Sequence, residues 1–181
     1  GPVCHAGGVV HDGRGLMLAA DQEAGKTTLT AGLVRAGCDY LSDEAMAFDA
    51  AGVITPFPKP LSIDPGSWHL FPELEPHADL PSSAYKDDQW QVPVEAIRAN
   101  AVGVACQAGW IVFPRYEAGA PTALEPVHRA EALIELARNT FHFADRSGEL
   151  LDQLADIVRD AAGHRPGGGP LAAAARPPRS R

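Results

Sequence analysis

The sequence has little cysteine and no long hydrophobic run. Its three cysteines, Cys4, Cys38 and Cys106, are far apart and form neither a CxxC pair nor a zinc-site spacing, which is typical of ordinary thiols in a reducing compartment. No stretch approaches the roughly 20 apolar residues that span a bilayer, and the first residues lack the charged and apolar regions of a signal peptide. We therefore expect a cytoplasmic protein without a membrane partner.

Positive charge is scarce over most of the chain, and several common catalytic motifs are missing. There is no GxSxG, no HExxH and no cysteine–histidine pattern. The formal charge is −8 over 181 residues, and residues 1–163 carry 11 basic and 23 acidic side chains. An acidic body argues against nucleic acid as a partner.

We expect one domain over residues 1–162 and a disordered basic tail over residues 163–181, which hold four arginines and no carboxylate.

Short hydrophobic runs separated by turn residues predict an α/β domain. Asp12-Gly13 is a strong hairpin signal between two valine- and leucine-rich runs, and Gly37 is placed to end a helix. The expected elements are, in order, strands at 9–10 and 16–18, a helix over 27–36, a strand over 38–48 that is interrupted at Asp43-Glu44, a partner strand over 53–57, a strand strongest at 110–116, a helix over 126–141 and a helix from Ser147 to Ala161.

The segment from Pro56 to Pro93 is rich in proline and shows little periodicity. Proline disfavours long helices and central strands. A long segment without regular structure is uncommon in a compact domain unless it forms a lid or a binding loop. We therefore expect an irregular segment that covers a site.

The stretch "AADQEAGKTTLTAGL", residues 19–33, has the order of a phosphate-binding loop: a strand, a polar loop, Lys26, Thr27 and a helix. Such a site needs backbone N–H groups at a helix N-terminus, a lysine for the outer phosphates and a hydroxyl for magnesium. Ala20 stands where such loops usually have glycine, and alanine is tolerated there if its φ is negative. We interpret the stretch as a modified, usable phosphate-binding loop.

Two carboxylates, Asp43 and Glu44, follow Lys26 by 17 and 18 residues, at the end of the next expected strand. Parallel strands of α/β sheets collect ligands at their carboxyl ends, so the pair is expected to face the phosphates. One carboxylate would hold magnesium, and its neighbour would take a proton from a substrate hydroxyl. The competing interpretation is a solvated strand end.

Four segments together resemble the C-terminal kinase domain of HPr kinase/phosphorylase and the related HPr-kinase-like serine kinases. They are "HAGG", "AADQEAGKTTL", "LVRAGCDYLSDE" and "PFPKPLS". The resemblance implies a P-loop fold related to phosphoenolpyruvate carboxykinase, with a mixed sheet and flanking helices. It also implies ATP and Mg²⁺ as ligands and phosphoryl transfer to a serine or another hydroxyl of a peptide or protein. Members often carry further strands or a domain before this point, which leaves open whether an N-terminal portion is missing.

The resemblance also implies roles for particular residues. Asp43 would be the catalytic carboxylate with His5 beside it, and Thr27 and Glu44 would hold magnesium. Lys59, between two prolines, is either a cation that steadies phosphate charge or an exposed loop lysine. The expected nucleotide-binding residues are Asp21, Gln22, Glu23, Ala24, Gly25, Lys26, Thr27 and Thr28.

Two other functions stay open at the level of the sequence. One is a nucleotide-binding regulatory module without catalysis. The other is a P-loop NTPase or phosphatase that uses water in place of the hydroxyl. A homo-oligomer and a monomer are equally compatible with the sequence.

Overall fold

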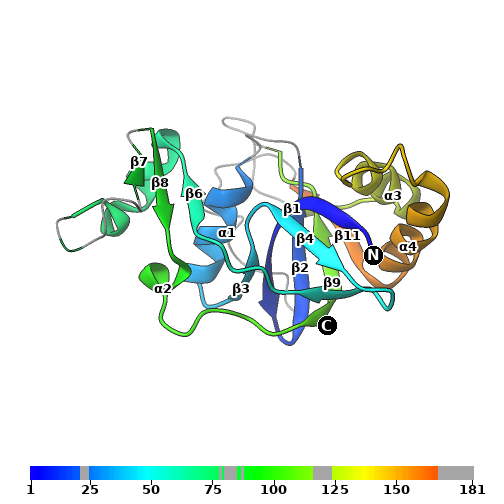
Figure 1. Cartoon of the computed structure of the whole chain (residues 1–181), viewed down its shortest axis with the longest axis horizontal. Coiled ribbons are helices and arrows are strands. Elements are labelled where there is room, and N and C mark those ends of the chain that lie inside the picture. Colours follow the sequence, from blue (N-terminus) through cyan, green and yellow to red (C-terminus); the bar gives the residue numbers. More distant parts are fainter. Residues whose placement is uncertain (21–24, 78, 80–84, 87, 116–123, 167–181) are drawn as a thin grey trace.

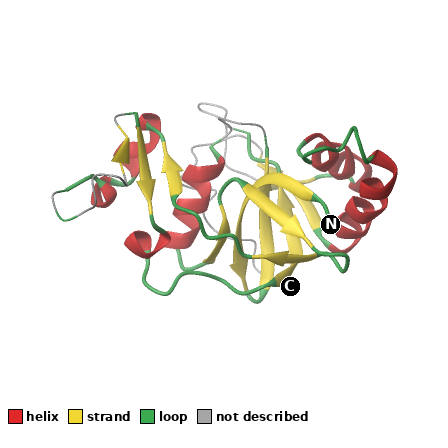
Figure 2. Cartoon of the chain, viewed as in Figure 1, coloured by secondary structure: helices red, strands yellow, loops and turns green. Residues whose placement is uncertain are grey.

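The computed structural model describes the chain except for residues 21–24, 78, 80–84, 87, 116–123 and 167–181 (Figure 1). The structure is mixed α/β, as the sequence predicts (Figure 2). The strands are β1 (Val3–His11), β2 (Arg14–Ala19), β3 (Asp39–Ser42), β4 (Ala45–Phe48), β5 (Val53–Thr55), β6 (Leu61–Ile63), β7 (Tyr85–Lys86), β8 (Gln89–Val92), β9 (Cys106–Val112), β10 (Leu124–Pro126) and β11 (Ala162–Pro166). The helices are α1 (Lys26–Arg35), α2 (Val94–Ile97), α3 (Arg129–Arg138) and α4 (Ser147–Asp160), with the 3₁₀ helices η1 (Pro65–Leu70) and η2 (Pro72–Leu74).

One large sheet forms the centre of the molecule. Its strand order is β10-β11-β9-β2-β1-β4-β5, with β3 also paired to β1 and β5 also paired to β9. The expected hairpin is confirmed, since β1 and β2 pair antiparallel around a turn in which Asp12 and Gly13 both have positive φ. The expected strand over 38–48 is present as β3 and β4, which flank Asp43 and Glu44.

Both faces of the large sheet are covered, as Figure 1 shows. Leu16 and Leu18 belong to a core shared with α1 and the three-stranded sheet formed by β6, β8 and β7. Met17 and Ala19, which alternate with them, belong to a second core shared with α3 and α4. Because successive side chains of a strand point to opposite faces, a run that is apolar at every position indicates a strand buried on both sides.

The strand directions bring several strand ends to one edge of the large sheet. β2 and β3 do not pair with each other. β1 lies between them and pairs antiparallel with both, so β2 and β3 run in the same direction. β9 is parallel to β2, and β11 is parallel to β9. β2, β3, β9 and β11 therefore end at the same edge, which we call the carboxyl edge.

The helices largely follow the sequence-based expectations. α1 begins at Lys26 and is followed by Ala36 and by Gly37, whose φ is 110°. α3 is shorter than expected because Pro126 ends β10 and the His128 ring accepts a hydrogen bond from the N–H of Ala130. None of the helices in the described part of the chain is long and apolar enough to cross a membrane.

The expectation of an irregular segment over 56–93 is wrong. Residues 61–97, which we call the small lobe, hold a three-stranded sheet in the order β6-β8-β7, with η1, η2 and α2. Leu61, Ile63, Trp90 and Val92 are buried against α1 and the large sheet. Prolines lie between these short strands, so they limit their length without preventing them.

The folded part of the chain extends beyond residue 162. β11 contains the first four residues of the segment that the sequence predicts to be a disordered tail. Residues 167–181 lie outside the described residues, where that expectation stays a prediction.

Candidate functional site

The N-terminus of α1 lies at the carboxyl edge, after the loop that follows β2. Gly25, immediately before α1, has φ 82° and ψ 18°, a left-handed conformation that favours glycine. No side chain in the described part of the chain caps this helix end, and its first turn holds no acidic residue. The first N–H groups of a helix have no partner within the helix, so this end is suited to bind an anion.

Lys26 is folded back over the start of the loop. Its side chain is only 7% exposed, and its Nζ donates a hydrogen bond of 2.6 Å to the carbonyl oxygen of Ala20. The described non-glycine residues with positive φ are Asp12, Asn100 and His142. Ala20 is therefore outside the left-handed region, which is the condition under which alanine is tolerated there.

Asp43 is a buried carboxylate in the bend between β3 and β4. It is 5% exposed, its Oδ2 accepts a hydrogen bond of 3.0 Å from Thr27 Oγ1, and the N–H of Ser62 lies 3.4 Å from the same oxygen. Its Oδ1 is buried without a hydrogen-bond partner among the described residues. Burial raises the pKa of Asp43 from 3.8 to about 6, although the hydrogen bonds from Thr27 and Ser62 and the nearby Lys59 and Lys26 oppose the rise.

Glu44 and Lys59 form an ion pair at the mouth of the site. Glu44 is about half exposed and Lys59 about one-third exposed. The main chain of Lys59 is fixed because its carbonyl accepts a hydrogen bond of 2.9 Å from the Tyr40 hydroxyl, and Tyr40 is fully buried.

His5 comes to the site from β1. Its backbone is paired with Ala45 on β4, and its N–H donates a hydrogen bond of 2.6 Å to the carbonyl of Asn139. Its ring lies edge-on to Phe141, with 5.8 Å between the ring centroids.

A cavity of about 700 Å³ joins these groups. It brings together most of the residues that the sequence points to, namely His5, Gly25, Lys26, Thr27, Thr28, Asp43, Glu44 and Lys59. Asp21, Gln22, Glu23 and Ala24 lie outside the described residues. The roles of all these residues stay predictions, whereas their convergence is a property of the fold.

The sequence reasoning missed one wall of this cavity, which the small lobe supplies. Ser62, Asp64, Ser67 and Gln89 line it, and Ser67 Oγ lies 2.6 Å from Thr28 Oγ1 at the start of α1. The signal was the alternation in "LSI" and "WQV", where a polar residue lies between two buried apolar ones.

The oxygen donors of the cavity suit a hard cation such as Mg²⁺. Mg²⁺ is usually held by one or two carboxylates together with substrate phosphates and water. Within the described ranges, no three His, Cys, Asp or Glu side chains gather as a metal cluster. The hydroxyl of Thr27 and the carboxylates of Asp43 and Glu44 therefore fit magnesium that arrives with a phosphate ligand better than a metal held by protein alone.

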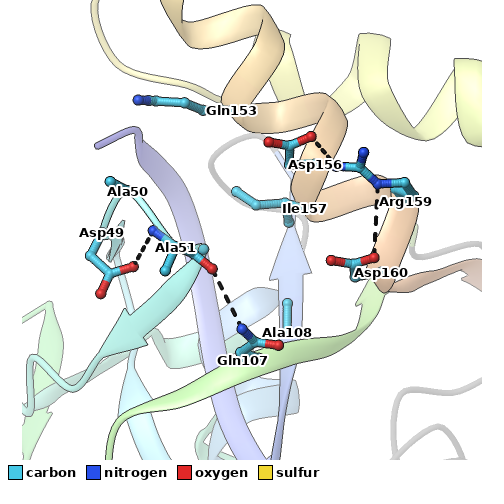
Figure 3. A pocket seen from close by; sticks show the side chains of 11 residues that line it. Asp49, Ala50, Ala51, Gln107, Ala108, Gln153, Asp156, Ile157, Arg159 and Asp160 are labelled. Carbon is cyan, nitrogen blue, oxygen red and sulfur yellow. Dashed lines mark hydrogen bonds and ion pairs between the residues drawn. The ribbon is translucent and has the colours of Figure 1, made fainter.

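A second, smaller cavity lies among the β4–β5 turn, the start of β9 and the end of α4 (Figure 3). Its volume is about 190 Å³, and its charged side chains contact other groups of the protein. Arg159 pairs with Asp156 and lies 3.9 Å from Asp160, while the Asp49 carboxylate accepts hydrogen bonds from the N–H groups of Ala51 and Val53. Because this cavity is smaller and its charged side chains contact the protein itself, we regard the larger cavity as the better candidate for a ligand site.

A close approach between α1 and β1 supports the site. A Cβ on Gly7 would lie 2.6 Å from Thr30 Oγ1 on α1, so we expect Gly7→Ala to lower the free energy of unfolding by about 1–3 kcal/mol. Chemical denaturation measures the change. A Cβ on Gly148 in α4 meets nothing within 4 Å, so Gly148→Ala is the control and should be neutral or slightly stabilising. Adding Thr30→Ala to Gly7→Ala should restore part of the loss; no recovery would contradict the stated cause.

The fold and the cavity thus define an α/β protein with a polar cavity at one edge of its sheet. No family model matches the sequence, and no curated protein matches it. Among solved structures, the chain is similar to the HPr(Ser) kinase/phosphatase from Coxiella burnetii, with 17% sequence identity and a TM-score of 0.38, covering 81% of this chain and 99% of that chain. This likeness is a distant structural relationship, and it says nothing about activity.

Proposed function

We propose that this chain is an ATP-dependent kinase of the HPr-kinase-like P-loop type, which transfers the γ-phosphoryl group to a serine or another hydroxyl of a peptide or protein. One observation carries the proposal. Lys26 and Asp43 line the same cavity, and Thr27, the neighbour of Lys26, donates a hydrogen bond to Asp43. A group for phosphates and a group for a hydroxyl proton are thereby held together at the start of one helix.

The N-terminus of α1 would be the binding site for the phosphates of ATP. Its backbone N–H groups and the Lys26 ammonium would bind the phosphates, after Lys26 exchanges the Ala20 carbonyl for a phosphate oxygen. Thr27 and Glu44 would hold Mg²⁺, which when bound neutralises charge on the phosphates. After its ion pair with Glu44 breaks, Lys59 would place a second positive charge beside the transferred phosphoryl group.

Asp43 would act on the hydroxyl that accepts the phosphoryl group. Its buried Oδ1 has no hydrogen-bond partner in the described part of the chain, so it is available to accept the proton of a substrate hydroxyl. A pKa of about 6 leaves the carboxylate mostly ionised at pH 7 and makes it a stronger base than an exposed aspartate. His5 lines the same cavity and would steady the orientation of Asp43, and the small-lobe wall would contact the acceptor.

The proposal is tested with the wild-type chain, labelled ATP and Mg²⁺, and a panel of serine-containing peptides. Each peptide is matched by a copy in which serine is replaced by alanine. We expect label on serine peptides only, and slow release of inorganic phosphate when no peptide is added. Phosphate release that is equally fast without any acceptor would indicate an NTPase, and binding of ATP without either product would indicate a regulatory module.

A further inference from the structure

The wall that the small lobe gives to the larger cavity is the polar face of its sheet. Ser62 is flanked on β6 by Leu61 and Ile63, which are fully buried, so its side chain points to the opposite face of the strand. Asp64 continues β6 with extended backbone, at φ −79° and ψ 157°, and its side chain therefore lies on the same face as that of Ser62. Both side chains line the cavity.

Two glutamine side chains join this face into one hydrogen-bonded row. Ser62 Oγ donates a hydrogen bond of 3.2 Å to Gln91 Oε1, and Gln91 Nε2 donates one of 2.6 Å to Gln89 Oε1. Gln89 Nε2 in turn donates a hydrogen bond of 2.9 Å to Asp64 Oδ1. Each NH₂ group carries two protons, and these contacts use one of them. A fixed row with both donors and acceptors suits the N–H and C=O groups of a peptide main chain.

The cavity has one more carboxylate than it has ammonium groups. Its lining contains Asp43, Glu44 and Asp64 against Lys26 and Lys59. Glu44 pairs with Lys59, and Lys26 lies close enough to Asp43 to oppose the rise of its pKa. Asp64 is exposed and forms no ion pair with a residue in the described part of the chain. Because the magnesium complex of ATP is itself an anion, a positively charged acceptor is favoured at this wall.

The place of Asp64 relative to Asp43 determines where that positive charge lies on the acceptor. The N–H of Ser62 is 3.4 Å from Asp43 Oδ2. Asp64 is two residues further along the same extended segment, which is about 7 Å. Two side chains on one side of an extended peptide have the same spacing. Asp43 Oδ1, which is buried without a hydrogen-bond partner among the described residues, marks the position of the acceptor hydroxyl.

We propose that the small-lobe wall binds the acceptor as an extended peptide in which an arginine or lysine two positions from the phosphorylated serine pairs with Asp64; this inference rests on the proposed kinase function. The serine hydroxyl lies at Asp43, and the peptide main chain contacts Ser62 and Gln89. Arginine fits better than lysine, because a guanidinium group can bind both oxygens of a carboxylate.

The test measures kcat/KM with Mg²⁺ and ATP for peptides that have blocked ends and one serine in an alanine and glycine background. Arginine is placed two positions before the serine, two positions after it, or next to it, and each peptide has a matched copy with glutamine. We expect arginine to raise kcat/KM about two- to fivefold at one of the two-residue positions, mainly by lowering KM, because the pair is exposed. The effect should be smaller at the adjacent position and should weaken with added salt.

Variants at Asp64 connect this preference to the wall. Asp64→Asn keeps the oxygen that accepts the hydrogen bond from Gln89 and removes the charge, so the ratio of kcat/KM between arginine and glutamine peptides should fall to about one. Asp64→Lys should reverse the preference and favour a glutamate peptide. Asp160→Asn, which removes an exposed carboxylate at the second cavity, is the control and should keep the wild-type ratio.

Three outcomes would overturn the inference and leave the kinase proposal intact. They are equal kcat/KM for arginine and glutamine peptides, an arginine effect of the same size at all three positions, and an arginine preference that persists in Asp64→Asn. If the wild-type chain phosphorylates none of the serine peptides, basic or neutral, the kinase proposal itself fails, and this inference fails with it.

Discussion

Replacing Asp43 by asparagine is expected to lower phosphoryl transfer by about 10²- to 10⁴-fold, the range that a positioned general base contributes. Asparagine has nearly the same shape and still accepts the hydrogen bond that Thr27 donates to the Oδ2 position. Nucleotide binding should therefore change little, because in the proposed site α1 and Lys26, not Asp43, would hold the phosphates. Single-turnover kinetics and calorimetric titration with Mg²⁺ and ATP measure the two quantities separately.

The same substitution should make the protein more stable at neutral pH. The pKa of Asp43 in the folded protein is about 6, against an ordinary aspartate value of 3.8. Between these two pH values the folded state binds more protons than the unfolded state, so stability falls as pH rises. Above pH 6 the ionised carboxylate costs up to about 3 kcal/mol. Asp43→Asn removes this cost at pH 7, whereas below about pH 4 the variant and the wild type should be alike. The wild-type transfer rate should rise with pH through about 6, as the base loses its proton.

Asp160→Asn is the matched control, because Asp160 is exposed and lies at the second cavity. It should leave transfer unchanged and stability within about 1 kcal/mol. An Asp43→Asn variant with wild-type transfer would remove Asp43 from the reaction. An unchanged unfolding free energy at pH 7 would show that the carboxylate is better solvated than its burial indicates.

Replacing Lys26 by methionine is expected to lower transfer by about 10²- to 10³-fold, the usual effect of removing one group that stabilises transition-state charge. It should also weaken nucleotide binding measurably. Methionine keeps the length of the buried side chain and removes the ammonium, so the fold should be little disturbed. Titration with Mg²⁺ and ATP gives the dissociation constant, and single-turnover assays give the rate.

Arg159→Met serves as the control for Lys26→Met, since it removes a cation from the second cavity. Its exposed ion pairs contribute little to stability, and neither binding nor transfer should change. Equal losses in the two variants would point to overall charge as the cause. Undiminished ATP affinity in Lys26→Met would contradict the assignment of α1 as the phosphate site.

Local patterns predicted the part of the fold that lies closest to the site. The hairpin followed from Asp12-Gly13, and α1 from the apolar spacing before Gly37. The break in the strand at Asp43-Glu44 was also visible, because two charged residues interrupt an apolar run. These signals arise from residues that are close to one another in the sequence, so they could be recognised without the structure.

The pairing of distant segments was not predictable in the same way. That β1 separates β2 from β3 depends on contacts across the whole sheet. The small lobe was missed because its strands are only two to four residues long, too short for a periodic pattern to stand out among prolines. Its wall of Ser62, Asp64, Ser67 and Gln89 appears only once β6 and η1 are folded against α1.

The ion pair between Lys59 and Glu44 has a consequence for which ligands the cavity admits. An anion that binds Lys59 alone would leave the Glu44 carboxylate without its partner. A cation that binds Glu44 alone would leave the Lys59 ammonium without its partner. A ligand carrying both signs, such as a divalent ion already chelated by a polyphosphate, exchanges partners with both groups at once and strands neither. If the cavity binds Mg²⁺-ATP as we propose, this ion pair would favour the chelate over either of its components, by a small factor because both side chains are partly exposed.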